Sequence, residues 1–324
     1  MKYEKVIIEI KDLVKEYKGG IRANDSISLT VNKGEVFGLL GPNGAGKSTM
    51  LSQLIGLLTP TSGKIVLGGI DIISNPEYAR KVCSFQPQND VPIDGLTVLQ
   101  AIELTGRLRG GNKVSVKKHT RELINALEIG QWANRQGQTL SGGVKRLVGY
   151  CMTVVYAGDI VILDEPTNDV DPLRRRKLWE QIRSVADSGI TVLLVTHNVL
   201  EAERVVDRLA IIDKGKILCS GTPASLKGSG MDKLRLELIL MTDTKITNLP
   251  CNPGTIRVGR RLRTIVEQDE IERSIEWAKK LKSKGIVEEF SVSPTSLEDV
   301  YVKMIGRADI IGDTVYQSQL EKAS

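Results

Sequence analysis

Residues 41–49 combine small, basic and hydroxyl side chains at a spacing that suits phosphate binding. The pattern G-x-x-x-x-G-K-[ST] is met by four residues: Gly41, Gly46, Lys47 and Ser48. Glycines let successive backbone N–H groups turn inward toward a polyphosphate. The lysine can reach the β- and γ-phosphates, and the serine hydroxyl can ligate Mg²⁺. The alternative interpretation is a glycine-rich turn that binds no ligand.

The segments on either side of this loop favour the binding interpretation. The apolar run 36–40 is predicted to form a buried strand, and residues 48–58 are predicted to form a helix. The apolar positions of that helix fall on one side: Leu51, Leu54, Ile55 and Leu58. A strand–loop–helix order places a bound phosphate at the positive end of a helix.

A pair of carboxylates follows a second apolar run. Asp164 and Glu165 end residues 159–165, and a similar run covers 190–196, with a predicted helix over 172–187 between them. This order predicts a βαβ unit of a parallel sheet, whose carboxyl edge is where such proteins bind ligands. There, Asp164 is placed to hold Mg²⁺ through water, and Glu165 to polarise an attacking water.

Three further signals are weak when each stands alone. Residues 140–143 open a helix and offer backbone N–H groups and the Ser141 hydroxyl to an anion, or form only an ordinary serine N-cap. His197 follows a buried strand and could touch a terminal phosphate or simply be packed. Gln88 could ligate Mg²⁺ and water, although loop glutamines commonly have no such role.

The order of these motifs resembles the nucleotide-binding domain of ATP-binding-cassette (ABC) proteins over residues 4–228. The resemblance implies that Tyr17 stacks on adenine, and that Ser141 and Gly143 contact a γ-phosphate held by a second subunit. Two ATP molecules would then lie in a head-to-tail dimer. The implied nucleotide-binding residues are Tyr17, Gly41, Asn43, Gly44, Gly46, Lys47, Ser48, Thr49, Ser141, Gly142, Gly143 and Asp171; the catalytic ones are Gln88, Glu165 and His197; the Mg²⁺ ligands are Ser48, Gln88 and Asp164.

Two departures from the family pattern stand out. Val144 occupies the place where the signature usually has glutamine, and residues 168–171 read Asn-Asp-Val-Asp in place of the commoner Ser-Ala-Leu-Asp. We expect turnover to survive and coupling to be altered. Residues 293–301, with 304–307, are similar to the C-terminal segment of ATPase subunits in drug-, antibiotic- and polymer-exporting ABC systems, of the daunorubicin-resistance type.

Composition agrees with a globular protein of two domains. Of 324 residues, 41% are hydrophobic and 26% charged, and a net charge of +6 suits an acidic ligand or the inner face of a membrane. Aromatic residues make up only 4%, which argues against a stacking surface for single-stranded nucleic acid. The four cysteines are far apart in sequence and predict reduced thiols. No apolar segment is long enough to span a membrane, and the charged start is not a signal peptide, so a cytoplasmic protein is expected.

The predicted fold class is α/β: a P-loop NTPase ABC cassette with a RecA-like parallel core, an antiparallel β subdomain and a helical subdomain. We predict this domain over residues 1–228, with the helical subdomain at about 90–156. A small α+β accessory domain is predicted over 231–306 and a tail over 307–324. The accessory domain should contain strands at 234–240 and 262–267, a helix at 269–284, and a capping pair formed by Thr295 and Glu298.

The sequence therefore predicts an ATPase subunit of an ABC transporter that acts as a dimer and drives transport, with export favoured. Such a protein would bind ATP and Mg²⁺ and sit on the inner face of the membrane through a separate permease. Two alternatives remain: a soluble ABC ATPase of the repair or translation class, and a regulatory ATP-binding module. A nucleic-acid-binding protein of unrelated type fits least. The transported substrate is not encoded in such a subunit.

Overall fold

The computed structural model describes residues 5–89, 91–227, 233–241 and 255–309. The chain divides into two compact units, Met1–Thr222 and Pro223–Ser324, which are described separately. The domain boundary predicted near residues 227–230 overlaps residues 228–232, which lie outside the described part, and the predicted tail lies mostly outside it as well.

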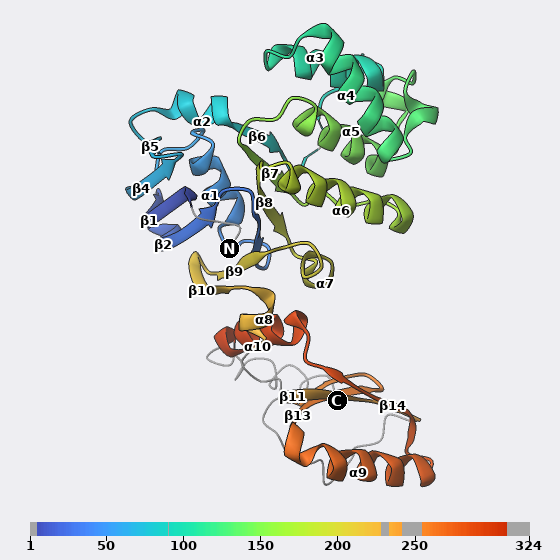
Figure 1. Cartoon of the computed structure of the whole chain (residues 1–324). Helices are drawn as coiled ribbons and strands as arrows, with labels where there is room; N and C mark the ends of the chain where they lie inside the picture. The colour runs from blue at the N-terminus through green and yellow to red at the C-terminus, as the bar shows by residue number, and fades with distance from the viewer. Residues whose placement is uncertain (1–4, 90, 228–232, 242–254, 310–324) are drawn as a thin grey trace. The chain divides into compact units, whose positions relative to one another are not determined.

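An antiparallel sheet in the first unit has the strand order β2-β1-β4-β5 (Figure 1). Its long strands are β1 (Val6–Tyr17) and β2 (Ile21–Asn32), joined by a tight turn, with β4 (Ser62–Leu67) and the short β5 (Ile70–Asp71) beside β1. One face of β1 is apolar and buried, through Ile8 and Ile10, as the alternating pattern of a half-buried strand requires.

A six-stranded sheet with the order β10-β9-β3-β8-β7-β6 forms the centre of the same unit. Five strands run parallel, and only β10 (Lys216–Gly221) is antiparallel to its neighbour β9 (Arg208–Asp213). The strands β3 (Val36–Leu40), β7 (Ile160–Asp164) and β8 (Thr191–Thr196) are buried at every position, which is why their sequences show apolar runs without alternation. The remaining strand is β6 (Cys83–Gln86). The predicted parallel core is confirmed.

The helix after the phosphate loop is shorter than predicted. We expected it to reach residue 58, but α1 spans Lys47–Leu54. Gly56 adopts φ +70°, and the N–H groups of Leu57 and Leu58 both donate to the carbonyl oxygen of Ser52, at 2.9 and 3.0 Å. A Cβ on Gly56 would lie 2.9 Å from the carbonyl oxygen of Pro76, so the turn is required where α1 meets α2 (Pro76–Val82).

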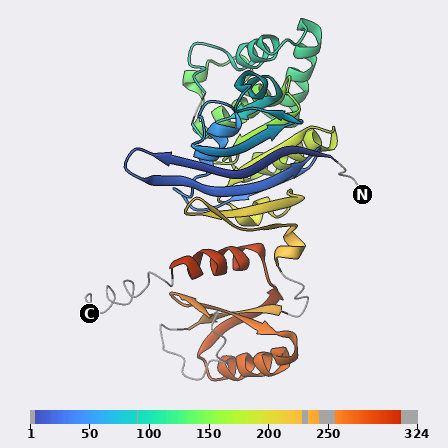
Figure 2. The ribbon, with the colours of Figure 1, turned by 90° about the vertical axis from the view of Figure 1, so that its left-hand side faces the viewer.

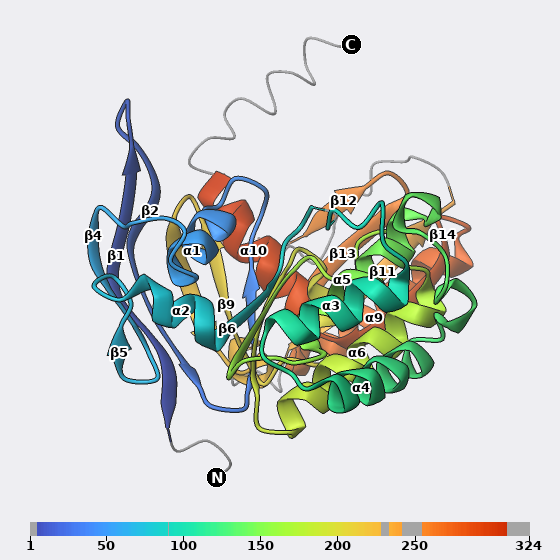
Figure 3. The same cartoon turned by 90° about the horizontal axis from the view of Figure 1, so that it is seen from above.

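A helical layer, green in Figure 3, lies on the side of the first unit away from the antiparallel sheet. It contains α3 (Val98–Leu108), α4 (Lys113–Ala126), two short 3₁₀ turns (Gly130–Trp132 and Gly137–Thr139) and α5 (Gly142–Val154). The sequence predicts a helix over residues 117–127 here, and α4 begins four residues earlier because the Asn112 side chain accepts a hydrogen bond from the Ser115 N–H at 2.9 Å. The unit also contains α6 (Pro172–Asp187), whose bounds match the prediction, and the short α7 (Val199–Ala202).

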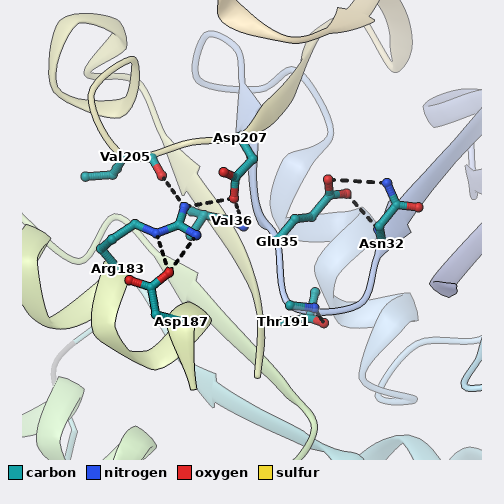
Figure 4. A network of polar contacts seen from close by, with 9 residues as sticks. Asn32, Glu35, Val36, Arg183, Asp187, Thr191, Val205 and Asp207 are labelled. Atoms are coloured by element: carbon teal, nitrogen blue, oxygen red, sulfur yellow. Dashed lines mark hydrogen bonds and ion pairs between the residues drawn. The ribbon is translucent and has the colours of Figure 1, made fainter. Parts of the chain in front are cut away.

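The edge where α6 meets the central sheet is fixed by charged groups (Figure 4). Asp207 accepts hydrogen bonds from the Val36 N–H and from the Arg183 guanidinium, both at 2.8 Å. Arg183 also pairs with Asp187 at 3.1 Å. One carboxylate thus joins the start of β3, the start of β9 and the end of α6, and so fixes the strand that leads into the phosphate loop.

The second unit contains one antiparallel sheet with the order β12-β13-β11-β14. The strands are β11 (Lys233–Leu240), β12 (Ile256–Val258), β13 (Arg261–Glu267) and β14 (Val287–Pro294). Helices α9 (Ile271–Ser283) and α10 (Leu297–Asp309) cover opposite faces of this sheet (Figure 2), and α8 (Pro223–Leu226) opens the unit. Buried Leu236, Leu238 and Ala278 form part of its own core. Only β11 and β13 were predicted as strands.

The predicted capping pair before α10 is wrong by one residue. The Asp299 carboxylate accepts hydrogen bonds from the Ser296 N–H and hydroxyl at 2.7 Å, and the Asp299 N–H donates back to the Ser296 hydroxyl at 3.3 Å. Thr295 and Glu298 have the same spacing, but the buried Leu297 sets the start of the helix after Ser296. In the part of the chain that the structure describes, no helix is both long and apolar enough to cross a membrane.

Candidate functional site

The glycines of the phosphate loop are held where no side chain would fit. A Cβ on Gly41 would lie 2.2 Å from the carbonyl oxygen of Ile212, and one on Gly46 would lie 2.1 Å from that of Ala23. Gly44 and Gly46 adopt φ of +81° and +100°, a region that favours glycine. The loop is therefore pressed against β9 and β2, which shapes a cradle of backbone N–H groups ahead of α1.

The Lys47 side chain is hydrogen-bonded to the backbone of the loop that precedes it. Its ammonium donates to the carbonyl oxygens of Gly41 and Pro42 at 2.7 and 2.9 Å, and only 8% of the residue is exposed. Burial lowers the pKa of Lys47, while the carboxylates of Glu165 and Asp164 act in the opposite direction. A phosphate placed over the loop would meet a cation that is already positioned and poorly hydrated.

Two buried amides behind the loop support it, and sequence reasoning missed both. Asn24 is fully buried and donates to the carbonyl oxygen of Gly46 at 3.0 Å. Gln53 donates to Asn24 Oδ1 at 2.6 Å and to the carbonyl oxygen of Thr49 at 3.1 Å. The available signal was Gln53 itself, a polar residue beside the apolar positions of α1, whose partner lies 29 residues away in sequence.

Asp164 and Glu165 emerge together at the carboxyl end of β7. Asp164 is 5% exposed, and burial, with a smaller contribution from the Glu165 charge, raises its pKa to about 6; Lys47 and Arg146 oppose the rise. Glu165 adopts φ +52°, which turns the chain sharply after the strand. The two carboxylates and Lys47 therefore lie in one electrostatic cluster.

The Glu165 carboxylate is fixed by three contacts from the end of β8. Its Oε2 accepts from the Thr196 hydroxyl at 3.0 Å, and its Oε1 accepts from the His197 N–H at 2.9 Å. The His197 ring Nδ1 lies 2.8 Å from the same Oε1, so one nitrogen of the ring faces the carboxylate. The structure thus brings Glu165 and His197 together, and it adds Thr196, which sequence reasoning did not select.

The loop that carries Gln88 is held through its backbone. The Arg146 guanidinium of α5 donates to the carbonyl oxygen of Pro87 at 2.9 Å and to that of Gln88. The Gln88 side chain itself is exposed. Arg146 was not selected from the sequence, because nothing local distinguishes it from the neighbouring lysine.

Ser141 caps α5 without using its hydroxyl for a capping hydrogen bond. In an ordinary serine N-cap, this oxygen accepts a hydrogen bond from a backbone N–H group of the first helical turn. A Cβ on Gly143 would lie 2.2 Å from the carbonyl oxygen of Asp169, a residue with φ +61°. Gly142 has no such close neighbour, since its nearest atom would lie 3.8 Å away. This turn therefore packs on residues 168–171 and leaves its hydroxyl uncommitted to α5.

Two other predicted residues have local partners. Asp171 caps α6, because its carboxylate accepts from the Arg174 N–H at 3.1 Å and pairs with the Arg174 guanidinium at 2.8 Å. Tyr17 ends β1, is 43% exposed, and has the Lys15 ammonium 5.6 Å from its ring centroid. An exposed ring at this position can still stack on a base.

Comparison with known proteins gives a consistent result. A family model described as ABC transporter matches residues 24–168. The chain is 39% identical over 232 residues to the daunorubicin/doxorubicin resistance ATP-binding protein DrrA of Streptomyces peucetius, covering 71% of this chain and 70% of that protein. It is 32% identical over 303 residues to the Nod factor export ATP-binding protein I of Cupriavidus metallidurans, covering 93% and 98%. A solved dimeric ATP-binding cassette in a post-hydrolysis state, bound to ADP and Pi, is similar with a TM-score of 0.61 at 26% identity, over 67% of this chain and 98% of that one.

Proposed function

The chain belongs to the ABC transporter family of ATP-binding proteins, and from this premise we propose that it powers an exporter whose membrane permease is a separate protein. The family membership makes it an ATP hydrolase and an ATP-binding subunit of the export and multidrug type. The observation that carries the proposal for catalysis is the fixed Glu165 carboxylate, which three contacts from residues 196 and 197 orient.

The phosphate loop fits a nucleotide triphosphate. The space that a side chain would need at Gly41 and Gly46 is taken by carbonyl oxygens, so only glycine fits there, and the bare backbone of the loop could approach a polyphosphate closely. Lys47 would exchange its two loop carbonyls for the β- and γ-phosphates. The backbone of residues 41–49, including Asn43, Gly44 and Thr49, would hold the remaining phosphate oxygens.

Mg²⁺ fits the oxygen atoms that the site offers. Ser48, Gln88 and Asp164 are hard, oxygen-bearing residues of the kind that Mg²⁺ prefers together with water and phosphate. When bound, the ion would neutralise charge that develops on the phosphates. Asp164 must ionise to serve it, and the positive charges of Lys47 and Arg146 favour that form against burial.

Glu165 is the proposed general base. Its Oε1 and Oε2 are both held by residues 196 and 197, so the carboxylate has a fixed orientation, and in this proposal it would take a proton from a water beside the γ-phosphate. The His197 ring faces the carboxylate through Nδ1, which leaves Nε2 as the nitrogen that would contact the γ-phosphate. General-base catalysis of this kind contributes about 10²–10⁴-fold to the rate.

A second subunit completes each site in this proposal. The Ser141 hydroxyl makes no capping bond to α5, and a Cβ on Gly142 would meet only ordinary contacts, the nearest at 3.8 Å. Ser141, Gly142 and Gly143 would contact the γ-phosphate of the neighbouring subunit, with Asp171 at the same interface, and Tyr17 would stack on adenine in its own chain. Dimeric cassette structures among the relatives support such a second nucleotide-binding subunit.

The permease would dock on the helical layer beside Gln88. Helix α3 exposes Leu104 and Leu108, at 46% and 78%, which gives that layer an apolar element for a membrane partner. Through the permease the protein would sit on the inner face of the cell membrane. The relatives are named for daunorubicin/doxorubicin resistance and for Nod factor export, and these names support export as the direction here.

Substitution of Glu165 by glutamine tests the central assignment. The variant should bind ATP with unchanged affinity, lose turnover by about 100-fold or more, and accumulate an ATP-bound dimer in sedimentation experiments. Glu180→Gln is a matched control, because this glutamate is exposed on α6, where it pairs with Arg176. Hydrolysis by the Glu165 variant at the wild-type rate would remove Glu165 from the mechanism.

A further inference from the structure

Arg146 joins the helix that begins at Ser141 to the loop that carries Gln88. The guanidinium leaves the second turn of α5 and donates to the carbonyl oxygens of Pro87 and Gln88, the former at 2.9 Å. These are backbone atoms of the loop itself. Because Gln88 and Asn89 are exposed, the two hydrogen bonds of the guanidinium, here called the Arg146 fork, connect the start of the loop to the helix.

Gln86, which precedes the loop, also donates a hydrogen bond back to α5. Gln86, the last residue of β6, is 2% exposed and donates to the backbone carbonyl oxygen of Arg146 at 2.9 Å. A Cβ on Gly149, one turn further along α5, would lie 3.3 Å from Gln86 Nε2. Three consecutive residues, from Gln86 to Gln88, are thus bonded to one position of α5.

The same helix carries Ser141 rigidly. The Lys145 N–H donates to the Ser141 carbonyl oxygen at 2.9 Å, which makes Ser141 and Arg146 neighbours on one α-helical segment. Arg146 is only 8% exposed, so its cation is shielded from solvent. A shift of the loop at Gln88 must therefore either move Ser141 or break buried hydrogen bonds.

We propose that Arg146 is a positioning residue that makes the two ATP sites of the dimer cooperative. This inference rests on the proposed function, in which Gln88 serves the site of its own chain and Ser141 serves the site of the partner. Arg146 fixes the distance between these two groups. Filling one site then brings Ser141 into place for the other.

The chemistry of the fork explains why arginine is needed. A planar guanidinium presents parallel N–H groups that can reach two neighbouring carbonyl oxygens at once, whereas a lysine ammonium on its flexible stem fixes one at a time. Arg146→Lys should therefore keep the charge and part of the fold but loosen the loop. Arg146→Met should keep the volume and remove both hydrogen bonds.

Arg109 offers a matched control within the same unit. It also holds two backbone carbonyl oxygens, those of Tyr156 at 3.0 Å and Lys81 at 3.3 Å, but it lies at the end of α3 with no part in the site. Arg109→Met should cost a comparable amount of thermal stability. It should leave the ATP dependence of hydrolysis unchanged.

The test measures ATP hydrolysis by the full chain as a function of ATP concentration, with thermal melting as a check on folding. We expect the wild type to be cooperative, with a Hill coefficient between 1 and about 2. Arg146→Met should bring the coefficient to about 1 and lower turnover by about tenfold. Binding of a fluorescent ATP analogue to dilute monomer should stay within about twofold, and Arg146→Lys should fall between the two.

The outcomes separate the two hypotheses. If Arg146→Met keeps the wild-type Hill coefficient while Ser141→Arg silences hydrolysis, the inference about Arg146 is overturned and the proposed function stands. A wild type without cooperativity also overturns it. If Arg109→Met reduces the coefficient as much as Arg146→Met does, the effect is only structural. If Ser141→Arg hydrolyses ATP normally, the proposed function itself fails and the inference with it.

Discussion

Two glycine-rich turns of this protein each place a serine at the start of a helix, and they are built in opposite ways. At the phosphate loop, Gly41 and Gly46 press on carbonyl oxygens and Lys47 is bonded within its own chain. At the turn before α5, the Ser141 side chain makes no capping bond, and a Cβ on Gly142 would lie no closer than 3.8 Å to its neighbours. The first turn is hydrogen-bonded within one chain, while the second leaves the Ser141 hydroxyl for the contact with a second subunit that we propose.

The difference teaches that glycine content alone does not identify a self-contained phosphate site. What distinguishes the phosphate loop is the layer behind it, where Asn24 and Gln53 hold the backbone from the far side. The turn at Ser141 makes its tightest approach at Gly143, which packs on the Asp169 backbone. The hydrogen bonds of Asn24 and Gln53 hold the backbone of the phosphate loop in one conformation. A turn without such bonds can change its conformation when a partner binds.

Lys47→Ala should produce the largest effect, because it removes the cation from the self-contained turn. Loss of a charged hydrogen-bond donor to the phosphates should weaken ATP binding by about 100-fold. Equilibrium binding of labelled ATP measures this. Lys145→Ala is the control at the other turn, since Lys145 pairs with the exposed Asp94 at 3.4 Å. Affinity of the Lys47 variant within twofold of wild type would contradict the role given to this lysine.

Ser141→Arg should silence hydrolysis while leaving monomeric ATP binding intact, because the lesion lies in the turn that, in the proposed function, serves another chain. Mixing this variant with Lys47→Ala subunits sharpens the comparison. Each mixed dimer then contains one site with both lesions and one with neither, so activity should return. Mixed dimers shown by sedimentation to form, yet inactive, would argue that both turns act on the same chain.

Asn24→Ala should remove hydrogen bonds that hold the phosphate loop from behind, so that this loop becomes more like the turn at Ser141. It leaves Gln53 without its acceptor and the Gly46 carbonyl without its donor, at an expected cost of about 1–3 kcal/mol in the free energy of unfolding. ATP affinity should fall less than it does in Lys47→Ala. Urea unfolding and ATP binding measure the two effects. Unchanged values in both would mean that the buried amides do not hold the loop.

Asp164→Asn should give the smallest effect, a gain in stability that depends on pH. The folded-state pKa, about 6, lies above the ordinary value of 3.8, so this carboxyl favours the folded state at low pH and loses that contribution as pH rises through about 6. The variant does not titrate, so its melting temperature should exceed that of wild type by about 2–4 °C at pH 7 and by little at pH 4. Asp94→Asn, at an exposed acid, is the control. A difference that does not vary with pH would contradict the raised pKa.

Much of the central sheet could be predicted because the local sequence of its strands already indicates a buried strand. The apolar runs of β3, β7 and β8 read as buried strands, and Asp171 with Pro172 marked the start of α6. Strands at sheet edges could not be predicted, because β14 and β12 gain their structure from pairing with β11 and β13. The end of α1 depended on the approach of Pro76, a contact that no local pattern contains.

The candidate site divides in the same way. Motif spacing selected Lys47, Asp164 and Glu165, whose roles depend on residue type and position in a loop or strand. It did not select Arg146 or Thr196, because a buried hydroxyl or guanidinium acquires its role from a partner at 31 to 59 residues distance. Spacing can reveal the groups that meet a ligand, but not the groups that hold them.

The carbonyl oxygen of Ala23 stands where a side chain at position 46 would begin. The phosphate end of the site consequently has no room for variation, whichever nucleobase is attached. The proposed base end is different, because Tyr17 is 43% exposed and pairs across the hairpin with Ile21, which is 67% exposed. With Tyr17 stacked on the base as proposed, an engineer seeking a protein that uses GTP would rebuild this outer hairpin and leave the loop untouched, since preference for a nucleobase and binding of a triphosphate would then be separately adjustable.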